Sequence, residues 1–432
     1  MNVDGENISE QQNVSFADAA RFWIKLGFIS FGGPAGQIAI MQTECVDRRR
    51  WIDQGAFLRG LNYCMLLPGP EAQQLAAYIG WRLHGVKGAV MAGTAFIVPG
   101  ALLIIFLAWL SAAHGESTLI KAAFLGVKPV VVAIVLQALW RIGRRTCNTL
   151  AGVIMATAAF VALYFLGTPF PAVIATAGII GIASARIPSI RFSTGGHGHG
   201  AAPEAAAETR SLGNEVRRLT IIFSVFAVLF ALPVIAVIQT LGAQPFADVA
   251  RLFTTAAFVT FGGAYAVLPY IADAGVNTYG WITPADMING LALAESTPGP
   301  LILVTTYVGY FAGWTNGGVL APAMQGVIAA ALTTYVTFLP SFLFILVGAP
   351  YVERLQENPY ARNALAAITA AVVGVILNLS VFLATAVFFP AEGVNWILIG
   401  AAVVSFVLLV TGRVSIPLLV AAGLFIGTAF GL

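Results

Sequence analysis

The sequence repeats itself at a fixed offset, and the repeated residues include those that interrupt helices. Four pairs of matching segments lie 230 residues apart: FADAARFW (from 16) and FADVARLF (from 246), FGG (31–33) and FGG (261–263), WI (51–52) and WI (281–282), and PGP (68–70) and PGP (298–300). Matches in a single register predict an internal duplication. In membrane transporters, such repeats commonly build the two sides of an alternating-access machine.

The composition places the chain in a membrane. Of its 432 residues, 59% are hydrophobic and 9% are charged, whereas soluble domains carry about 25% charged residues. The apolar segments are long enough for spanning helices, so the sequence predicts an all-α polytopic membrane protein. Spans are expected near 87–112, 118–141, 147–166, 170–187, 216–241, 317–349, 360–389, 395–412 and 414–431.

No motif for a metal, a cofactor or a nucleic acid stands out. The three cysteines, Cys45, Cys64 and Cys147, are widely spaced and form no metal-binding or disulfide pattern. A dinucleotide fingerprint or haem motif, which a membrane-embedded reductase would need, is also missing from the sequence. We therefore expect no cofactor, no metal site and no enzymatic activity.

The repeat divides the chain into segments. We expect a polar tail over 1–15, a first transporter repeat over 16–187, a linker over 188–214, a connecting transmembrane helix over 215–242 and a second repeat over 246–432. The linker is polar and rich in Gly, Ala and Ser, with basic residues at both ends, which is typical of a flexible cytoplasmic segment. We interpret its GGHGHG run as part of the linker.

The distribution of Lys and Arg predicts that the two repeats have opposite orientations. No Lys or Arg occurs from Leu252 to Glu353. The corresponding part of the first half includes Arg48, Arg49, Arg50, Arg59, Arg82 and Lys87. Because cytoplasmic loops carry the excess of basic residues, the same loops should face opposite sides in the two halves. We expect an inverted-topology repeat, with the helix near 216–241 as the odd element that inverts the second copy.

The Gly and Pro breaks predict re-entrant or discontinuous helices, because open backbone at membrane depth is tolerated only in a cavity lined by protein or water. Gly residues allow tight reversals, and Pro34 and Pro70 suit the first position of the following half-helix. Each half-helix N-terminus offers free N–H groups and about half a positive charge, which suits a small oxyanion. The predicted substrate-binding residues in these breaks are Gly32, Gly33, Pro34, Pro68, Gly69, Pro70, Gly262, Gly263, Pro298, Gly299 and Pro300.

Ionisable and polar side chains lie near the breaks. Arg21 and Lys25 share one helical face before the first break and are predicted to contact the anion; the alternative is that Arg21 lies near the surface and anchors its helix. Glu71 and Glu295 are candidates for carrying a coupled proton, although Glu71 also suits a helix first turn. Polar residues beside the PGP breaks would line the path or join helices: Gln73, Gln74, Thr297, Thr305 and Thr306.

Segments 16–53, 66–104, 261–270 and 281–310 resemble the signature regions of the chromate ion transporter family, in its long two-domain form. The second copy departs from the first, with Ala264 in place of Pro34 and Leu301 in place of Glu71. The resemblance implies efflux of chromate across the bacterial inner (plasma) membrane. We expect the linker to lie in the cytoplasm and the chain to be embedded in the lipid bilayer. A homodimer is a further expectation.

The alternatives are a transporter of sulfate or another small oxyanion, by import or exchange, and an anion channel. Chromate and sulfate are both doubly charged and tetrahedral, so backbone N–H groups and a basic side chain separate them poorly. We do not expect the chain to bind nucleic acid.

Overall fold

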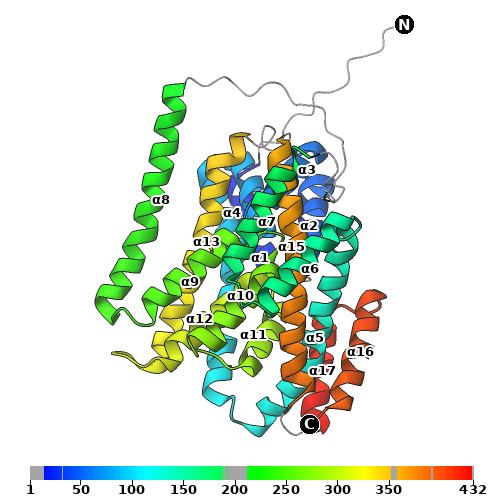
Figure 1. The fold of residues 1–432 in the computed structure, drawn as a ribbon. Helices are drawn as coiled ribbons and strands as arrows, with labels where there is room; N and C mark the ends of the chain where they lie inside the picture. Colours follow the sequence, from blue (N-terminus) through cyan, green and yellow to red (C-terminus); the bar gives the residue numbers. More distant parts are fainter. Residues whose placement is uncertain are drawn as a thin grey trace.

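The computed structural model describes residues 14–31, 33–187, 192, 212–351, 358–390 and 393–430. Within these ranges the secondary structure is helical, and the helices form a bundle with α8 standing apart at one side (Figure 1). Gly32 and almost all of the predicted linker lie outside the described residues. Among the helices of the described ranges, five are long and apolar enough to cross a membrane. The chain is an all-α polytopic membrane protein.

The two halves contain the same elements in the same order. The first half consists of α1 (Phe16–Ile29), α2 (Gly33–Gln42), the π-helix η1 (Thr43–Arg48), α3 (Gln54–Leu66), α4 (Glu71–His114), α5 (Thr118–Thr146), α6 (Leu150–Tyr164) and α7 (Phe170–Ser184). After α8 (Leu212–Leu241), the second half consists of α9 (Phe246–Val259), α10 (Ala264–Asp273), the π-helix η2 (Ala274–Thr278), α11 (Pro284–Ser296), the 3-10 helix η3 (Leu301–Leu303), α12 (Val304–Thr315), α13 (Pro322–Gly348), the 3-10 helix η4 (Ala349–Tyr351), α15 (Pro359–Phe388), α16 (Trp396–Val410) and α17 (Ile416–Phe430).

The lengths of the paired elements confirm that the breaks recur in register. Helices α1 and α9 each have 14 residues, α2 and α10 each have 10, and α3 and α11 each have 13. The helices therefore end at FGG and at PGP in both halves. Helix α4 corresponds to η3, α12 and α13 together. It has a kink at His84 and Gly85, whose backbone angles are non-helical.

The paired long helices run in opposite directions. Helix α4 ends at the lower end of the bundle in Figure 1, whereas α13 ends at the upper end. Helix α8 runs downward beside the bundle in Figure 1, and α9 follows at its lower tip. Helix α8 thus connects two copies whose long helices α4 and α13 run in opposite directions.

Each half packs its central helix against the last two helices of the other half. Helix α15 contacts α6 and α7, and its counterpart α5 contacts α16 and α17. Small residues allow these backbones to approach closely: a Cβ on Gly126 in α5 would collide with the backbone of Gly423 in α17. Small residues have this role at helix interfaces in membranes, where apolar attraction between helices is weak.

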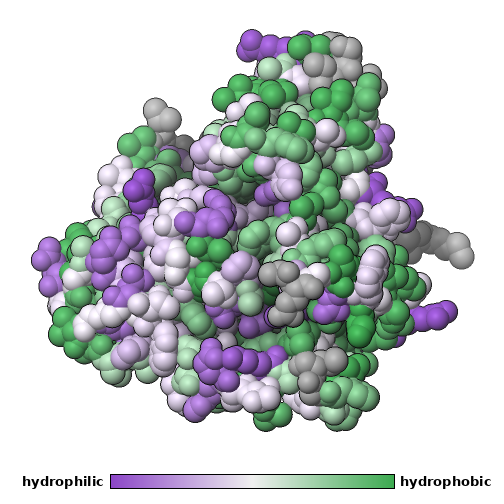
Figure 2. Space-filling view, turned by 60° about the horizontal axis from the view of Figure 1, so that its bottom comes forward, coloured by the Kyte–Doolittle hydropathy of each residue, from purple (hydrophilic) through white to green (hydrophobic). Residues whose placement is uncertain are grey.

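The outer surface suits a lipid environment. In Figure 2, hydrophobic residues cover broad areas of the face shown, and hydrophilic residues gather in patches between them. On α8, the most apolar 18-residue window of the helix has no buried residues, and Phe223, Val228 and Leu232 are exposed. In a bilayer these apolar side chains would contact lipid and not water, so the free-energy cost of hydrating them would not arise.

Candidate functional site

The four breaks meet in two pairs, and each pair joins the two halves. The backbone N–H of Gly69, in the first PGP, donates to the carbonyl of Thr260, before the second FGG, at 2.7 Å. Reciprocally, the N–H of Gly299, in the second PGP, donates to the carbonyl of Ser30, before the first FGG, at 3.1 Å. The two hydrogen bonds connect equivalent residues, so the pairing follows the pseudo-twofold symmetry of the repeat.

Glycine is required at the centre of each PGP for two reasons. Gly69 and Gly299 have φ angles of +117° and +104°, in the region that side chains with a Cβ rarely adopt. Both residues also approach a long helix closely: a Cβ on Gly69 would lie 2.9 Å from Ser341 Oγ on α13, and one on Gly299 would lie 3.5 Å from the Cα of Gly100 on α4. The two sequences PGP are therefore docked on matching helices.

The helices that start at the breaks keep their first N–H groups free of side-chain caps. The N-cap residues of α4, α10 and η3 are Pro70, Gly263 and Pro300, and none of them makes a side-chain cap hydrogen bond. By contrast, Ser15, Asp53, Ser117 and Thr283 cap the helices that follow them. Uncapped N-termini in the interior leave donors and a partial positive charge available for an anion.

Gln37 joins one pair of breaks through its side chain. It is fully buried on α2, and its Nε2 donates to the carbonyl of Gly299 at 2.6 Å and to the carbonyl of Ser30 at 3.1 Å. Its Oε1 is buried and has no hydrogen-bond partner. The equivalent residue in the second half is Val267, so this bridge exists only once.

Gln73 and Gln74, in the first turn of α4, are also fully buried. Gln74 Nε2 donates to the carbonyl of Pro68 at 2.7 Å, whereas both polar atoms of the Gln73 amide lack a partner. A buried polar group without a partner costs about 1–3 kcal/mol, so this amide marks a place where a polar ligand or water fits. Their counterparts are the apolar Leu303 and Val304.

The unpartnered amide of Gln73 and the Pro298–Gly299 break lie close together along α4. A Cβ on Gly93 would lie 2.8 Å from Gln73 Nε2, and Gly100 lies against the Pro298–Gly299 break. Gly93 and Gly100 are seven residues apart on one face of α4, which corresponds to about 10 Å along the helix. The breaks and the amides therefore form one compact centre.

The two predicted acids occupy different positions in this centre. Glu71 is half-buried at the start of α4, and its Oε1 would lie 3.9 Å from a Cβ on Gly263, the N-cap of α10. Glu295 is buried on α11 and accepts a hydrogen bond from Tyr265 on α10. Arg141 on α5 is close enough to Glu295 and Tyr265 to interact with both electrostatically.

The predicted basic residues lie on the exposed side of α1. The Arg21 side chain is 81% exposed and forms an ion pair with Asp18 at 3.3 Å, and Lys25 is also exposed. Contact of Arg21 and Lys25 with a bound anion remains a prediction. Two smaller details differ as well: Pro70 is the N-cap of α4 instead of its first helical residue, and Pro34 is the second residue of α2.

The threonines near the second PGP join helices or bond to their own helix. Thr306 Oγ1 shares a hydrogen bond with Thr334 of α13 at 2.8 Å, and Thr305 Oγ1 donates to the carbonyl of Ile302 at 2.7 Å. Sequence reasoning missed Gln37 and Tyr265. The signal for Gln37 was a polar residue in an apolar half-helix, four residues after Gly33.

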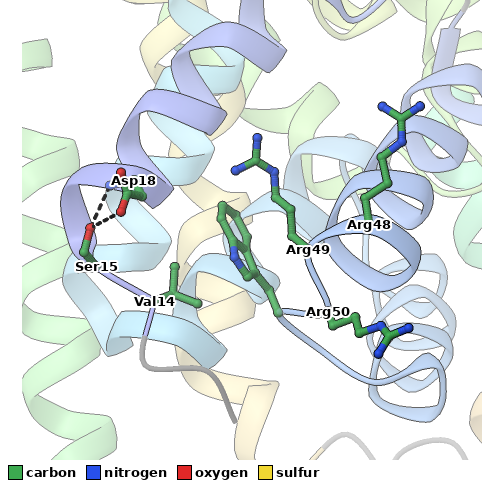
Figure 3. A pocket seen from close by; sticks show the side chains of 7 residues that line it. Val14, Ser15, Asp18, Arg48, Arg49 and Arg50 are labelled. Carbon is green, nitrogen blue, oxygen red and sulfur yellow. Dashed lines mark hydrogen bonds between the residues drawn. The ribbon is translucent and has the colours of Figure 1, made fainter.

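A pocket of about 410 Å³ opens at the end of the first half that carries the basic loop, lined by Val14, Ser15, Asp18, Arg48, Arg49, Arg50 and Trp51. Arg49 stacks over Trp51 and Phe22, at 5.0 Å from each ring centroid, and bonds to Glu44 at 3.3 Å. Figure 3 shows Arg48 and Arg49 pointing to one side of the loop and Arg50 to the other.

The corresponding loop of the second half has the same backbone and no basic residue. The N–H of Trp51 donates to Cys45 O at 2.8 Å, as that of Trp281 does to Gly275 O. Arg50 has a φ angle of +51°, and its counterpart Gly280 has +64°. The chain thus keeps an arginine in a conformation that favours glycine.

The comparisons agree with this architecture. The model of the family described as "Chromate transporter" matches residues 17–182 and 247–428, one match in each half. A chromate transport protein of Pseudomonas aeruginosa is 32% identical over 361 residues, which cover 83% of this chain and 78% of the relative. One of Cupriavidus metallidurans is 25% identical, covering 84% and 81%. No solved structure matches the chain significantly. This chain belongs to the chromate transporter family.

Proposed function

We propose that the chain carries chromate out of the cytoplasm by alternating access, with the oxyanion held at the half-helix N-termini of the two pairs of breaks. Family membership makes the chain a transport protein and not an enzyme. The observation that carries the finer proposal is the crossed pairing of the breaks, with uncapped helix N-termini near the fully buried, unpartnered amide of Gln73.

The chemistry of this centre suits a doubly negative tetrahedral ion. Helix N-termini offer N–H donors whose positions are set by backbone, and each adds about half a positive charge. Together, four such ends approach the charge of the ion. Amide N–H groups such as Gln73 Nε2 add neutral hydrogen-bond donors, which bind an oxyanion less strongly than a buried arginine does. An ion held in this way is stabilised and still able to leave.

The two hydrogen bonds between the halves suit a movement of one repeat against the other. Gly69 N–H to Thr260 O and Gly299 N–H to Ser30 O are symmetric, so weakening one while keeping the other opens the centre toward one side. Rocking of inverted repeats around a central site is the general form of alternating access. The symmetry of the bonds provides two equivalent end states.

The proposed site is reached from the cytoplasm past the basic loop. Arg48, Arg49 and Arg50 line the pocket at one end of the first half, and Arg21 pairs with Asp18 beside it. We infer that this end faces the cytoplasm, together with the linker over 188–214, in the bacterial inner membrane. Arg21 and Lys25 would then attract the oxyanion toward the first break.

Transport by the purified full-length chain in liposomes tests this function. We expect saturable uptake of labelled chromate that responds to an imposed voltage, because the ion carries net charge. Excess sulfate should reduce the flux only weakly if the chain selects chromate. Flux that does not saturate would indicate an anion channel, and equal displacement by sulfate would indicate a general oxyanion transporter.

Cysteine labelling tests the orientation of the two halves. Cysteines introduced at the exposed positions Asp47 and Thr278, in a Cys147→Ser background because Cys45 and Cys64 are buried, should react from opposite sides of the membrane. In intact cells, an impermeant thiol reagent should modify Thr278→Cys and leave Asp47→Cys unmodified, because the basic loop should be cytoplasmic. Modification of both, with the membrane intact, would exclude the inverted orientation.

A further inference from the structure

Glu71 lies beside the N-terminal ends of two helices from different halves. It is the first residue of α4, so its carboxylate lies at the positive end of its own helix. Its Oε1 also lies against Gly263, the N-cap of α10 in the second half, where a Cβ would be 3.9 Å away. This is the position that an oxyanion at the α10 N-terminus would take.

The carboxylate has no described counter-charge. Among the described residues, Glu71 forms no hydrogen bond and no ion pair with a side chain. The titratable group that faces it from α3 is the buried thiol of Cys64. Helix α10 contributes backbone at Gly263. The helix ends are therefore what holds a negative charge at this place.

The other half has no such group. The residue equivalent to Glu71 is Leu301, at the start of η3, so the N-terminus of α2 receives no acid from its partner break. The buried amide whose two polar atoms both lack a partner, Gln73, is also on the first half. The centre thus has one N-terminal end that a side-chain carboxylate fills and one that is left open.

We propose that Glu71 is an internal anion that occupies the α10 N-terminus, and that the transported oxyanion takes this place when Glu71 binds a proton. This inference rests on the proposed function. A carboxylate and a dianion repel each other at one site, whereas a protonated carboxyl donates a hydrogen bond to the ion. Proton binding and oxyanion binding therefore strengthen each other by the same factor, and the two are carried together.

Binding of chromate to the full-length protein in detergent tests the proposal. Between about pH 7.5 and 9, wild-type affinity should fall about tenfold per pH unit, because each ion bound requires one proton. Glu71→Gln should bind chromate with an affinity that does not change over this range. Glu71→Asp should keep the pH dependence, and Glu116→Gln, which removes an exposed acid paired with Lys121, should behave as wild type.

The outcomes separate this inference from the proposed function. A Glu71→Gln protein that elutes as wild type and retains the tenfold pH dependence would overturn the role of Glu71, with chromate binding intact. Wild-type affinity that is independent of pH would overturn it as well. Failure of both wild type and Glu71→Gln to bind or transport chromate would instead remove the proposed function. Binding of chromate with release of protons into an indicator dye, in place of uptake, would also contradict the proposal.

Discussion

Gly100→Val is expected to abolish chromate transport, with a loss of about 100-fold or more. The Cβ of any residue at this position would collide with the carbonyl of Pro298. That atom belongs to the backbone of a docked break, so it has no rotamer by which to move aside. Overpacking at a closely packed contact typically costs 1–3 kcal/mol, and here the strain displaces the Gly299–Ser30 hydrogen bond. Labelled chromate uptake in liposomes measures the loss.

The matched control is Gly400→Val. Gly400 is also in the interior of an apolar helix, α16, but a Cβ there meets no atom within 4 Å. The same substitution at that position should leave transport close to wild type, because the added side chain extends into open space. Both proteins should elute as single species from a sizing column. Wild-type transport by Gly100→Val would show that the Pro298 break moves freely relative to α4.

Gln37→Leu is expected to reduce transport about tenfold to 100-fold. Leucine has a similar size but removes the donor that holds the carbonyls of Ser30 and Gly299. The carbonyl of Gly299 loses its donor, and a buried acceptor left unsatisfied costs about 1–3 kcal/mol. The carbonyl of Ser30 keeps the hydrogen bond from the Gly299 N–H, but the two breaks lose the side-chain bridge between the halves. Initial rates of chromate uptake measure this effect, since the protein should still fold around an apolar residue at this position.

Gln42→Leu is the control for this change. Gln42 is on the same helix, and its side chain bonds to Gln54 at 3.4 Å near the surface. Loss of that exposed hydrogen bond should change the rate by less than about twofold, because water replaces the partner. Equal rates for Gln37→Leu and Gln42→Leu would mean that the bridge between Ser30 and Gly299 has no part in transport.

The helix breaks were predictable from the sequence because their causes are local. Gly69 and Gly299 need positive φ angles that only glycine adopts readily, and the flanking prolines cannot continue a helix. The repeat was predictable for the same reason, since it consists of the same local signals at a constant offset. The distribution of Lys and Arg predicts the orientation of the two halves in the membrane, and this stays a prediction.

The exposure of Arg21 could not be predicted in this way. Its position before a break suggested the cavity, but which face of α1 turns inward depends on packing against α4. Trp23 and Leu26 are fully buried there, and Arg21 lies on the opposite side with Asp18. Hydrophobic burial of a large aromatic side chain outweighs any preference of one cation.

The local chemistry of glycine and proline decided where the helices stop and how often the pattern recurs. The tertiary structure decided which break meets which. Gly69 bonds to Thr260, and Gln37 bonds to Gly299 across 262 residues. Contacts at such separations depend on how the halves dock, and the residue types alone do not encode a partner. For this reason the amides of Gln37 and Gln73, and the contact of Glu71 with α10, become visible only in the folded molecule.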